Sequence, residues 1–213
     1  MKFNNVTLST AVQSWLANES EAKKQYGHIS YWDTSEVNNM SRLFMNAREF
    51  NEPLYWNTSI VENMSYMFYK AQKFNQYLKW DTGKVDTMYK MFCHASIYNQ
   101  PVNWDTRKVE NMQYMFCNAN AYFQFIIIDT RTVERMNCML YGTKLQTMFN
   151  IFSLQNVHNY YLYVNYFKRR NYLMFLKMSG YLSYNDVGAK QQNRAVDNVF
   201  NISDIHKHIA SYI

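Results

Sequence analysis

A short sequence repeat, strictly regular in length, is the feature that most constrains how this 213-residue chain can fold. Tryptophan recurs four times at every twenty-fourth position, and isoleucine takes the fifth place: Trp32, Trp56, Trp80, Trp104 and Ile128. Valine follows each of these residues after five positions and methionine follows after eight. A unit this short cannot bury an apolar core alone, so neighbouring units must cover one another. The repeat therefore predicts an elongated stack of about five units.

Each unit is expected to contain one short α-helix after a more extended stretch. In the first unit, four apolar residues have the spacing of a single helix face: Met40, Leu43, Phe44 and Ala47. A residue suited to helix capping precedes this pattern in four units: Asn39, Asn63, Thr87 and Asn111. A two-turn helix is unstable alone, so stacking must stabilise it. We therefore predict the fold class α/β: a leucine-rich-like repeat solenoid with a short strand and a short helix in each coil.

The repeat divides the chain into three segments. We predict an N-terminal helical cap over residues 1–31, a solenoid of about five repeats over 32–145, and a mainly helical C-terminal segment over 146–213. The fifth repeat lacks the tryptophan, which indicates that the solenoid ends near residue 145. Caps are required because the terminal apolar faces of a stack would otherwise meet water.

Both end segments contain signals for helices. Thr10 begins a capping-box sequence, and Gly27 is expected to end a second helix. Three residues of the first helix are expected to face inward: Val12, Trp15 and Leu16. Near the other end, an amphipathic helix is expected to place Ile205 and Ile209 on one side.

Charge is distributed unevenly along the chain. Residues 32–127 hold nine Lys or Arg and nine Asp or Glu, whereas residues 128–213 hold ten and five, so most of the net charge of +6 follows the repeats. The candidate partner-binding residues are Lys84, Arg107, Lys108 and Arg131 in the turns, Lys168, Arg169 and Arg170 in a basic cluster, and Ile205 and Ile209 in the last helix. The alternative for the basic groups is an ordinary solvated surface. We disfavour nucleic-acid binding.

The sequence carries no pattern that indicates catalysis or metal binding. It lacks a phosphate-binding glycine loop, an H-E-x-x-H motif and a G-x-S-x-G motif. The aspartates of the turns share their place with Asn57, which indicates turn chemistry. Cys93 and Cys117 lie one repeat apart, where a disulfide is conceivable, but we expect reduced thiols. We therefore predict a protein that is not an enzyme and has no catalytic residue, no metal ligand and no cofactor.

The sequence also lacks the apolar runs of membrane and secreted proteins. No run approaches the roughly 18 apolar residues that a membrane-spanning helix needs, and Phe125–Ile128 is followed at once by Asp129. Residues 1–16 contain no apolar core typical of a signal peptide. We expect no membrane span and no secretion.

The repeat resembles a known family. Residues 32–47 read Trp-Asp-Thr-Ser-x-Val-x-Asn-Met-Ser-x-Leu-Phe-x-x-Ala. This resembles the leucine-rich-like surface-protein repeats of BspA type, which are also seen in mycoplasma lipoproteins, protists, algae and giant DNA viruses. The resemblance covers roughly residues 8–145 and includes a lead-in, Tyr26–Ser30, that is similar to the family's N-terminal cap. It implies a repeat domain for binding or surface assembly, without enzymatic residues.

The resemblance and a bias toward residues with A/T-rich codons point to a giant DNA virus or a protist. We therefore expect a structural, protein-interaction protein: a virion-associated minor capsid component whose partners are capsid or assembly neighbours, located in the virion or the host cytoplasm. The alternative is a cytosolic substrate adaptor whose C-terminal helix resembles part of an F-box and recruits a ubiquitin ligase. The oligomeric state is left open.

Overall fold

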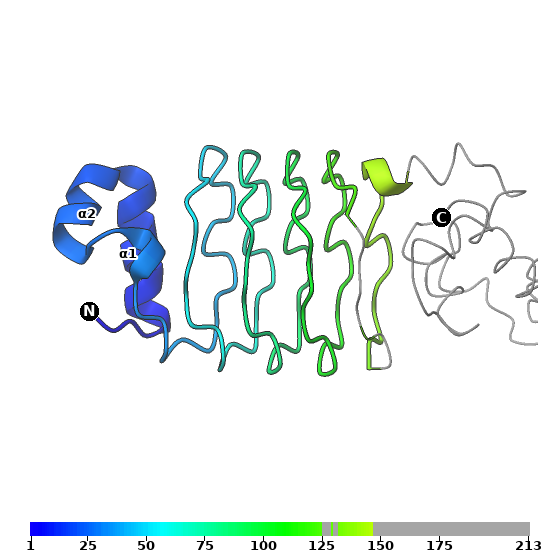
Figure 1. Ribbon diagram of the computed structural model, residues 1–213, viewed down its shortest axis with the longest axis horizontal. Coiled ribbons are helices and arrows are strands. Elements are labelled where there is room, and N and C mark those ends of the chain that lie inside the picture. Colours follow the sequence, from blue (N-terminus) through cyan, green and yellow to red (C-terminus); the bar gives the residue numbers. More distant parts are fainter. Residues whose placement is uncertain (125–128, 130–131, 147–213) are drawn as a thin grey trace, which may run out of the picture.

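The computed structural model of the chain describes residues 1–124, 129 and 132–146. Within them, coils that each correspond to one sequence repeat lie side by side along the long axis, with helices at the N-terminal end (Figure 1). We number the coils one to five from positions 32, 56, 80, 104 and 128, and we call them together the coil stack. The C-terminal segment predicted for 146–213 lies outside the described residues except for its first residue.

Two α-helices and one 3-10 helix close the N-terminal end: α1 (Asn5–Ala17), α2 (Glu19–Tyr26) and η1 (Ile29–Tyr31). The predicted capping box is wrong, because α1 begins earlier. Asn4 caps it by accepting hydrogen bonds from the N–H groups of Val6 and Thr7, and the Thr7 side chain bonds back to the Asn4 backbone N–H. Thr10 lies inside α1, where its hydroxyl donates to the carbonyl of Val6.

The inward face of α1 is also narrower than predicted. Val12 and Trp15 are buried, but Leu16 is 41% exposed, so its predicted inward orientation is wrong. Gly27 ends α2 with a φ of 77°, a left-handed conformation that glycine adopts without strain, and this prediction is confirmed.

Helix α1 is bonded to the first coil in the way that one coil is bonded to the next. The Asn5 side chain accepts hydrogen bonds from the N–H groups of Asn38 and Asn39 at 3.1 and 3.2 Å, and donates to the Asn38 side chain. Phe3 donates its N–H to the carbonyl of Asp33 at 2.8 Å. These bonds supply hydrogen-bond partners to backbone groups of coil one that would otherwise have none at the end of the stack.

Backbone hydrogen bonds join each coil to the next in parallel register. Isolated parallel bridges connect equivalent residues along the stack: Asn39 with Asn63, Asn63 with Thr87, Thr87 with Asn111, and Asn111 with Arg135. After each bridge, alternate N–H groups donate to carbonyl groups of the next coil at 2.7 to 3.0 Å, as in Met40 to Asn63, Arg42 to Ser65, Phe44 to Met67 and Asn46 to Tyr69. Strand-like pairing of this kind sets neighbouring coils about 4.8 Å apart.

The short helix predicted in each repeat is not formed. Residues 40–47 make a run of tight turns, in which Met45 donates to the Arg42 carbonyl and Ala47 to the Phe44 carbonyl, both at 3.1 Å. In an α-helix, each N–H group would donate to the carbonyl group four residues earlier. Here the alternate N–H groups, such as those of Met40 and Phe44, already donate to carbonyl groups of the next coil. Since a two-turn helix is marginal, the bonds between coils prevail. The described coils contain isolated bridges in place of strands, and the α/β class stays a prediction.

Left-handed backbone at two fixed positions makes the run of turns possible. Among the described residues, nine other than glycine have a φ between 53° and 64°: Arg42, Asn46, Tyr66, Lys70, Lys90, His94, Tyr114, Asn118 and Cys138. Gly142 takes the equivalent place in coil five with a φ of 73°. A positive φ at the third residue is what a type II turn requires. The residues predicted as helix caps begin these runs instead, since Asn39 and Asn63 each accept from the N–H two residues later at 2.9 Å.

Aromatic ladders fill the core. Phe44, Phe68, Phe92 and Phe116 stack with ring centroids 5.3 to 5.5 Å apart and planes within 5° of parallel. A second ladder consists of Phe50, Phe74, Tyr98 and Tyr122 at 5.9 to 6.1 Å. Within each coil, one ring of each ladder packs on the other at 3.9 to 4.1 Å. The shared interior is therefore continuous from coil to coil.

The tryptophans form a third buried row. Trp32 and Trp56 stack with centroids 6.4 Å apart and planes 11° from parallel. The indole N–H of Trp80 donates to the Leu54 carbonyl, and that of Trp104 donates to the Leu78 carbonyl, both at 3.2 Å. All four tryptophans are buried. The prediction that they line a shared interior is confirmed.

We predict that Trp80→Ala lowers the free energy of unfolding by about 3–5 kcal/mol, because it empties a large aromatic site and removes an indole hydrogen bond. Urea denaturation of the full chain, followed by far-UV circular dichroism, measures the change. Lys79→Ala, at the exposed neighbouring position, is the control and should change stability by less than about 0.5 kcal/mol. Equal stabilities of the two variants would show that Trp80 is not a core residue.

We predict that Tyr98→Phe raises the free energy of unfolding by about 1 kcal/mol, because a buried hydroxyl without a partner costs free energy that phenylalanine avoids. Tyr98 is fully buried and its hydroxyl has no hydrogen-bond partner, while the same place in coils one and two holds Phe50 and Phe74. Urea denaturation again measures the change. The reverse change, Phe74→Tyr, is the matched control and should destabilise by a similar amount; destabilisation by both changes would contradict the explanation.

Candidate functional site

One edge of the coil stack, which we call the turn edge, is built from the Asp-Thr and Asn-Thr turns. The first residue of each turn accepts a hydrogen bond from the N–H two residues later: Asp33 from Ser35, Asn57 from Ser59, Asp81 from Gly83 and Asp105 from Arg107. Short polar side chains commonly close turns in this way. The predicted turn role of these residues is confirmed.

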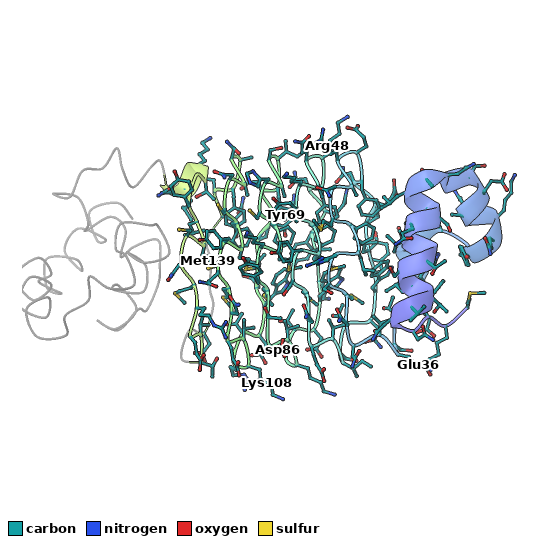
Figure 2. The ribbon with its side chains drawn as sticks, turned by 180° about the vertical axis from the view of Figure 1, so that it is seen from behind. Glu36, Arg48, Tyr69, Asp86, Lys108 and Met139 are labelled. Atoms are coloured by element: carbon teal, nitrogen blue, oxygen red, sulfur yellow. The ribbon has the colours of Figure 1, made fainter. Side chains whose placement is uncertain are left out.

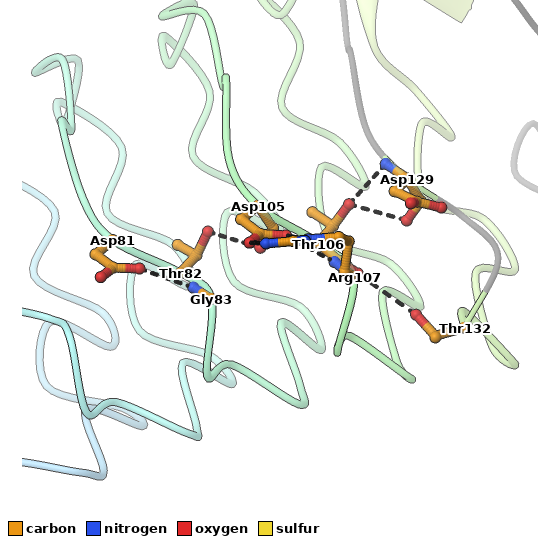
Figure 3. A network of polar contacts seen from close by, with 8 residues as sticks. All are labelled: Asp81, Thr82, Gly83, Asp105, Thr106, Arg107, Asp129 and Thr132. Carbon is orange, nitrogen blue, oxygen red and sulfur yellow. Dashed lines mark hydrogen bonds and ion pairs between the residues drawn. The ribbon is translucent and has the colours of Figure 1, made fainter.

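The buried threonine that follows ties each turn to the next coil. Its hydroxyl donates to a carbonyl of that coil at 2.8 to 2.9 Å: Thr34 to Asn57, Thr58 to Asp81, Thr82 to Asp105, and Thr106 to Asp129. Figure 3 shows the last two of these contacts. Because a buried hydroxyl needs a partner, these bonds fix the register of the turn edge. Side chains exposed along it must therefore stand in rows.

The structure places three of the predicted partner-binding residues on the turn edge. Lys84 and Lys108 are exposed at the same place in neighbouring coils. Arg107 is exposed too, but its Nε and Nη2 atoms donate to the Asp105 carboxylate at 2.9 and 2.6 Å (Figure 3). This hydrogen-bonded ion pair lowers the pKa of Asp105 to about 2 and raises the pKa of Arg107. The charge of Arg107 is therefore balanced within its own turn.

The other predicted partner-binding residues lie outside the part of the chain that the structure describes. They are Arg131, Lys168, Arg169, Arg170, Ile205 and Ile209. Their roles stay predictions.

Sequence reasoning missed a second surface, which we call the basic-tyrosine face. It consists of the exposed and half-buried residues in the runs of tight turns: 39–48, 63–72, 87–96, 111–120 and 135–144. Tyr69 and Arg48 of this face are labelled in Figure 2. Its long side chains stand largely at the left-handed positions, where the backbone conformation repeats from coil to coil.

Cations and tyrosine rings are interleaved on this face. The Lys90 Nζ atom lies 5.1, 5.2 and 5.7 Å from the ring centroids of Tyr114, Tyr89 and Tyr66. The Arg42 guanidinium lies 5.2 Å from the Tyr66 centroid on the other side along the stack. The Tyr66 and Tyr89 rings meet edge to face, with centroids 5.1 Å apart. Cation–π contacts of about 0.5–1 kcal/mol each hold these side chains in one arrangement.

The basic-tyrosine face has positive charge and no negative charge. Its five runs contain no Asp or Glu. They contain six Lys or Arg residues: Arg42, Arg48, Lys70, Lys90, Arg135 and Lys144. None of the six forms an ion pair with another described residue. Burial, together with the charges of Lys70 and Lys90, lowers the pKa of His94 below its ordinary value, which favours the neutral form of this side chain.

Carboxylates form a row directly before the basic-tyrosine face. This acidic column consists of Glu62, Asp86, Glu110 and Glu134. The N–H of each residue donates to the carbonyl of the equivalent position one coil earlier at 2.8 to 2.9 Å, so the backbone holds them in register. All four are exposed, and none pairs with a cation among the described residues. Partial burial, and then the charge of Glu62, raises the pKa of Asp86.

The three cysteines are free thiols, as predicted. Cys93 and Cys117 are buried at the same place in coils three and four, and Cys138 is half-buried in coil five. The hydrogen bond between the thiols of Cys93 and Cys117, followed by burial, raises the pKa of Cys93. The same hydrogen bond is the largest cause of a lowered pKa at Cys117. The pair packs as small side chains beside the core.

Residues 1–124, 129 and 132–146 contain neither a metal-binding cluster nor a membrane-spanning helix. Among these residues, no three His, Cys, Asp or Glu side chains are placed so that they could hold a metal ion together. None of the helices in this part of the chain combines the length and the apolar character needed to cross a bilayer.

A family model matches most of the chain. The family is described as "Mycoplasma protein of unknown function, DUF285", and it matches residues 10–127 and, in an overlapping match, 78–172. The chain belongs to this family. DUF285 agrees with the predicted resemblance at the level of a mycoplasma-type repeat family. Comparison with curated proteins and with solved structures found no match.

A signal for the basic-tyrosine face was present in the sequence of this DUF285 chain. When the repeats are aligned, the same ten places of all five lack acidic residues, and the place just before them is acidic in four. The pattern is inconspicuous along the chain, because no repeat contributes more than two cations and the fourth contributes none. Reading across the repeats reveals it.

We predict that Arg107→Gln raises the pKa of Asp105 from about 2 toward its ordinary value of 3.8, because the Arg107 side chain is the largest cause of the shift. The pKa is depressed in the folded state, so the pair favours folding above the ordinary pKa and this contribution is lost as the pH falls through about 2. An NMR titration of the Asp105 carboxyl carbon measures the shift. Lys108→Gln is the control, and an Asp105 pKa unchanged by Arg107→Gln would contradict the assignment.

Proposed function

We propose that the chain is a non-enzymatic repeat scaffold that binds other proteins through side-chain rows of the coil stack. The observation that carries the proposal is the common register of the coils, which places equivalent surface residues in rows one coil apart. Repeat proteins of this kind typically use such extended surfaces for binding. The DUF285 family is itself of unknown function and adds no activity to the proposal.

The basic-tyrosine face is the surface that we propose for binding. Tyrosine and arginine are enriched at protein interfaces because they offer large contact area together with hydrogen-bonding groups. The contacts of Lys90 with three tyrosine rings order the face before a partner arrives, which lowers the entropic cost of association. Unbalanced positive charge favours a partner surface rich in carboxylates.

The geometry of the tyrosines favours a protein over a single-stranded nucleic acid. Nucleic-acid bases stack on open aromatic rings, but Lys90 already lies over Tyr66, Tyr89 and Tyr114. The charges of residues 32–127 also balance at nine of each sign, so the coils lack the overall positive charge typical of nucleic-acid binding.

We propose that Lys84 and Lys108 on the turn edge make secondary contacts with the same protein partner.

Two narrower roles predicted from the sequence stay predictions. The family match gives no support to a virion-associated capsid component. The ubiquitin-ligase adaptor depends on Ile205 and Ile209, which lie outside the described residues.

Site-specific photo-crosslinking in the producing cells tests the proposal. Benzoylphenylalanine replaces Tyr66 or Tyr114 on the basic-tyrosine face, and Tyr55 or Tyr77 as exposed tyrosines outside it. We expect adducts to defined proteins from the two positions on the face and little from the two controls, measured by immunoblotting and mass spectrometry. Equal yields from all four positions, or adducts to nucleic acid alone, would overturn the proposal.

A further inference from the structure

We infer that the coil stack binds a second copy of this chain, with the acidic column of each molecule against the basic-tyrosine face of the other. The inference rests on the proposed function, because it names the partner of the proposed binding surface. Three observations carry it: an unpaired row of carboxylates, unpaired cations on the adjoining face, and a common register of the coils that hold both.

The acidic column is unfavourable in the free molecule. Its carboxylates are held in register by backbone hydrogen bonds, so neighbours stand about 4.8 Å apart at their backbones. Like charges directly opposite each other on adjacent strands are destabilising. Glu62, Asp86 and Glu110 have no cation within the described residues to relieve this repulsion. Cations from a partner would relieve it.

The cations of the same chain lie on coils one, two, three and five, so their intervals along the stack are whole multiples of the step of the acidic column. The column and the basic-tyrosine face each advance by one step per coil, because both are set by the same hydrogen bonds between coils. A second copy in the same register therefore brings Lys70 level with Glu62 and Lys90 level with Asp86 without any adjustment of either backbone, whereas coil four supplies no cation for Glu110. An unrelated acidic or basic protein would match only if its charges had the same interval.

The two rows also adjoin on the coil. Glu62 directly precedes the run 63–72, and Asp86 directly precedes 87–96. In Figure 2, Asp86 lies nearer the turn edge, marked by Lys108, than Tyr69 does. When a second copy is turned by half a revolution about the long axis of the stack, its acidic row faces the basic row of the first, and the reverse contact forms at the same time. The resulting dimer is closed and symmetric.

The acidic column argues against a polyanion on this surface. A nucleic acid seated on the basic-tyrosine face would bring its phosphates beside Glu62, Asp86 and Glu110, and like-charge contacts of this kind disfavour a partner. A second copy satisfies both rows. Its approach also meets no net repulsion from residues 32–127, where positive and negative charges are equal in number.

Sedimentation of the full chain at two ionic strengths is the first test. We expect a dimer at low salt that dissociates progressively as salt is added, because screening shortens the range of the charges from about 30 Å at 0.01 M to about 8 Å at 0.15 M. A monomer at low salt and at the highest accessible protein concentration would overturn the inference.

Charge reversal on either row supplies the second test. The acid-reversed variant carries Glu62→Lys, Asp86→Lys and Glu110→Lys. The face-reversed variant carries Arg42→Glu, Lys70→Glu and Lys90→Glu. The control variant carries Lys23→Glu, Lys24→Glu and Lys79→Glu, which lie outside the acidic column and the basic-tyrosine face. Each reversal should weaken self-association by more than about 100-fold, and the control should match the unmodified chain. A 1:1 mixture of the two reversed variants should form a dimer again, because each now supplies what the other lacks. A mixture that stays monomeric would overturn the inference.

A measurement without substitutions guards against a variant that fails to fold. Carbodiimide joins a carboxylate directly to a lysine amine, and a mixture of ¹⁵N-labelled and unlabelled chains distinguishes bonds between copies from bonds within one. We expect crosslinks between copies that join Lys70 or Lys90 to Glu62, Asp86 or Glu110. Crosslinks only within single copies would overturn the inference, and photo-adducts from Tyr66 to another protein would then leave the proposed function intact.

Discussion

Hydrogen bonds from each coil to the next determine the position of every other group in the coil stack. Alternate N–H groups of the tight-turn runs, such as those of Met40 and Phe44, find their acceptors in the next coil, and so does the buried hydroxyl of Thr82. No coil can satisfy these groups alone. A slip of one residue between coils would leave these groups without hydrogen-bond partners and would move the core rings out of line. The register is therefore fixed both by the hydrogen bonds and by the packing of the core.

The register that organises the interior also organises the surface, with opposite energetic consequences. Inside, it places Phe68 parallel to Phe92 and favours packing. Outside, it places Glu62, Asp86 and Glu110 in one row, which electrostatics alone would disfavour. The unfavourable row persists because the backbone imposes it. A surface that is ordered in this way presents several equivalent groups to a partner before any partner binds.

The sequence predicted the period and the tryptophan row, because both depend only on which residues recur. It did not predict the conformation of residues 40–47, since the inward spacing of Met40, Phe44 and Ala47 fits a run of tight turns as well as it fits a helix. What decides between the two is the carbonyl group of another coil, which a local pattern does not contain. The basic-tyrosine face was missed for a related reason: Arg42 and Lys90 are far apart along the chain and become neighbours of the same tyrosine only after stacking.

The junctions between coils repeat one pattern of backbone bonds. At helix α1 the Asn5 side chain takes the place of a coil carbonyl, because it accepts from the N–H groups of Asn38 and Asn39 as the Asn38 carbonyl accepts from those of Glu62 and Asn63. A block of one repeat can therefore be duplicated or deleted in the gene without creating a new kind of junction. Each added block would lengthen every surface row by one step. Repeat number then sets the valency of the molecule, and avidity for a partner with the same periodicity can evolve by copying, with no change in any single contact.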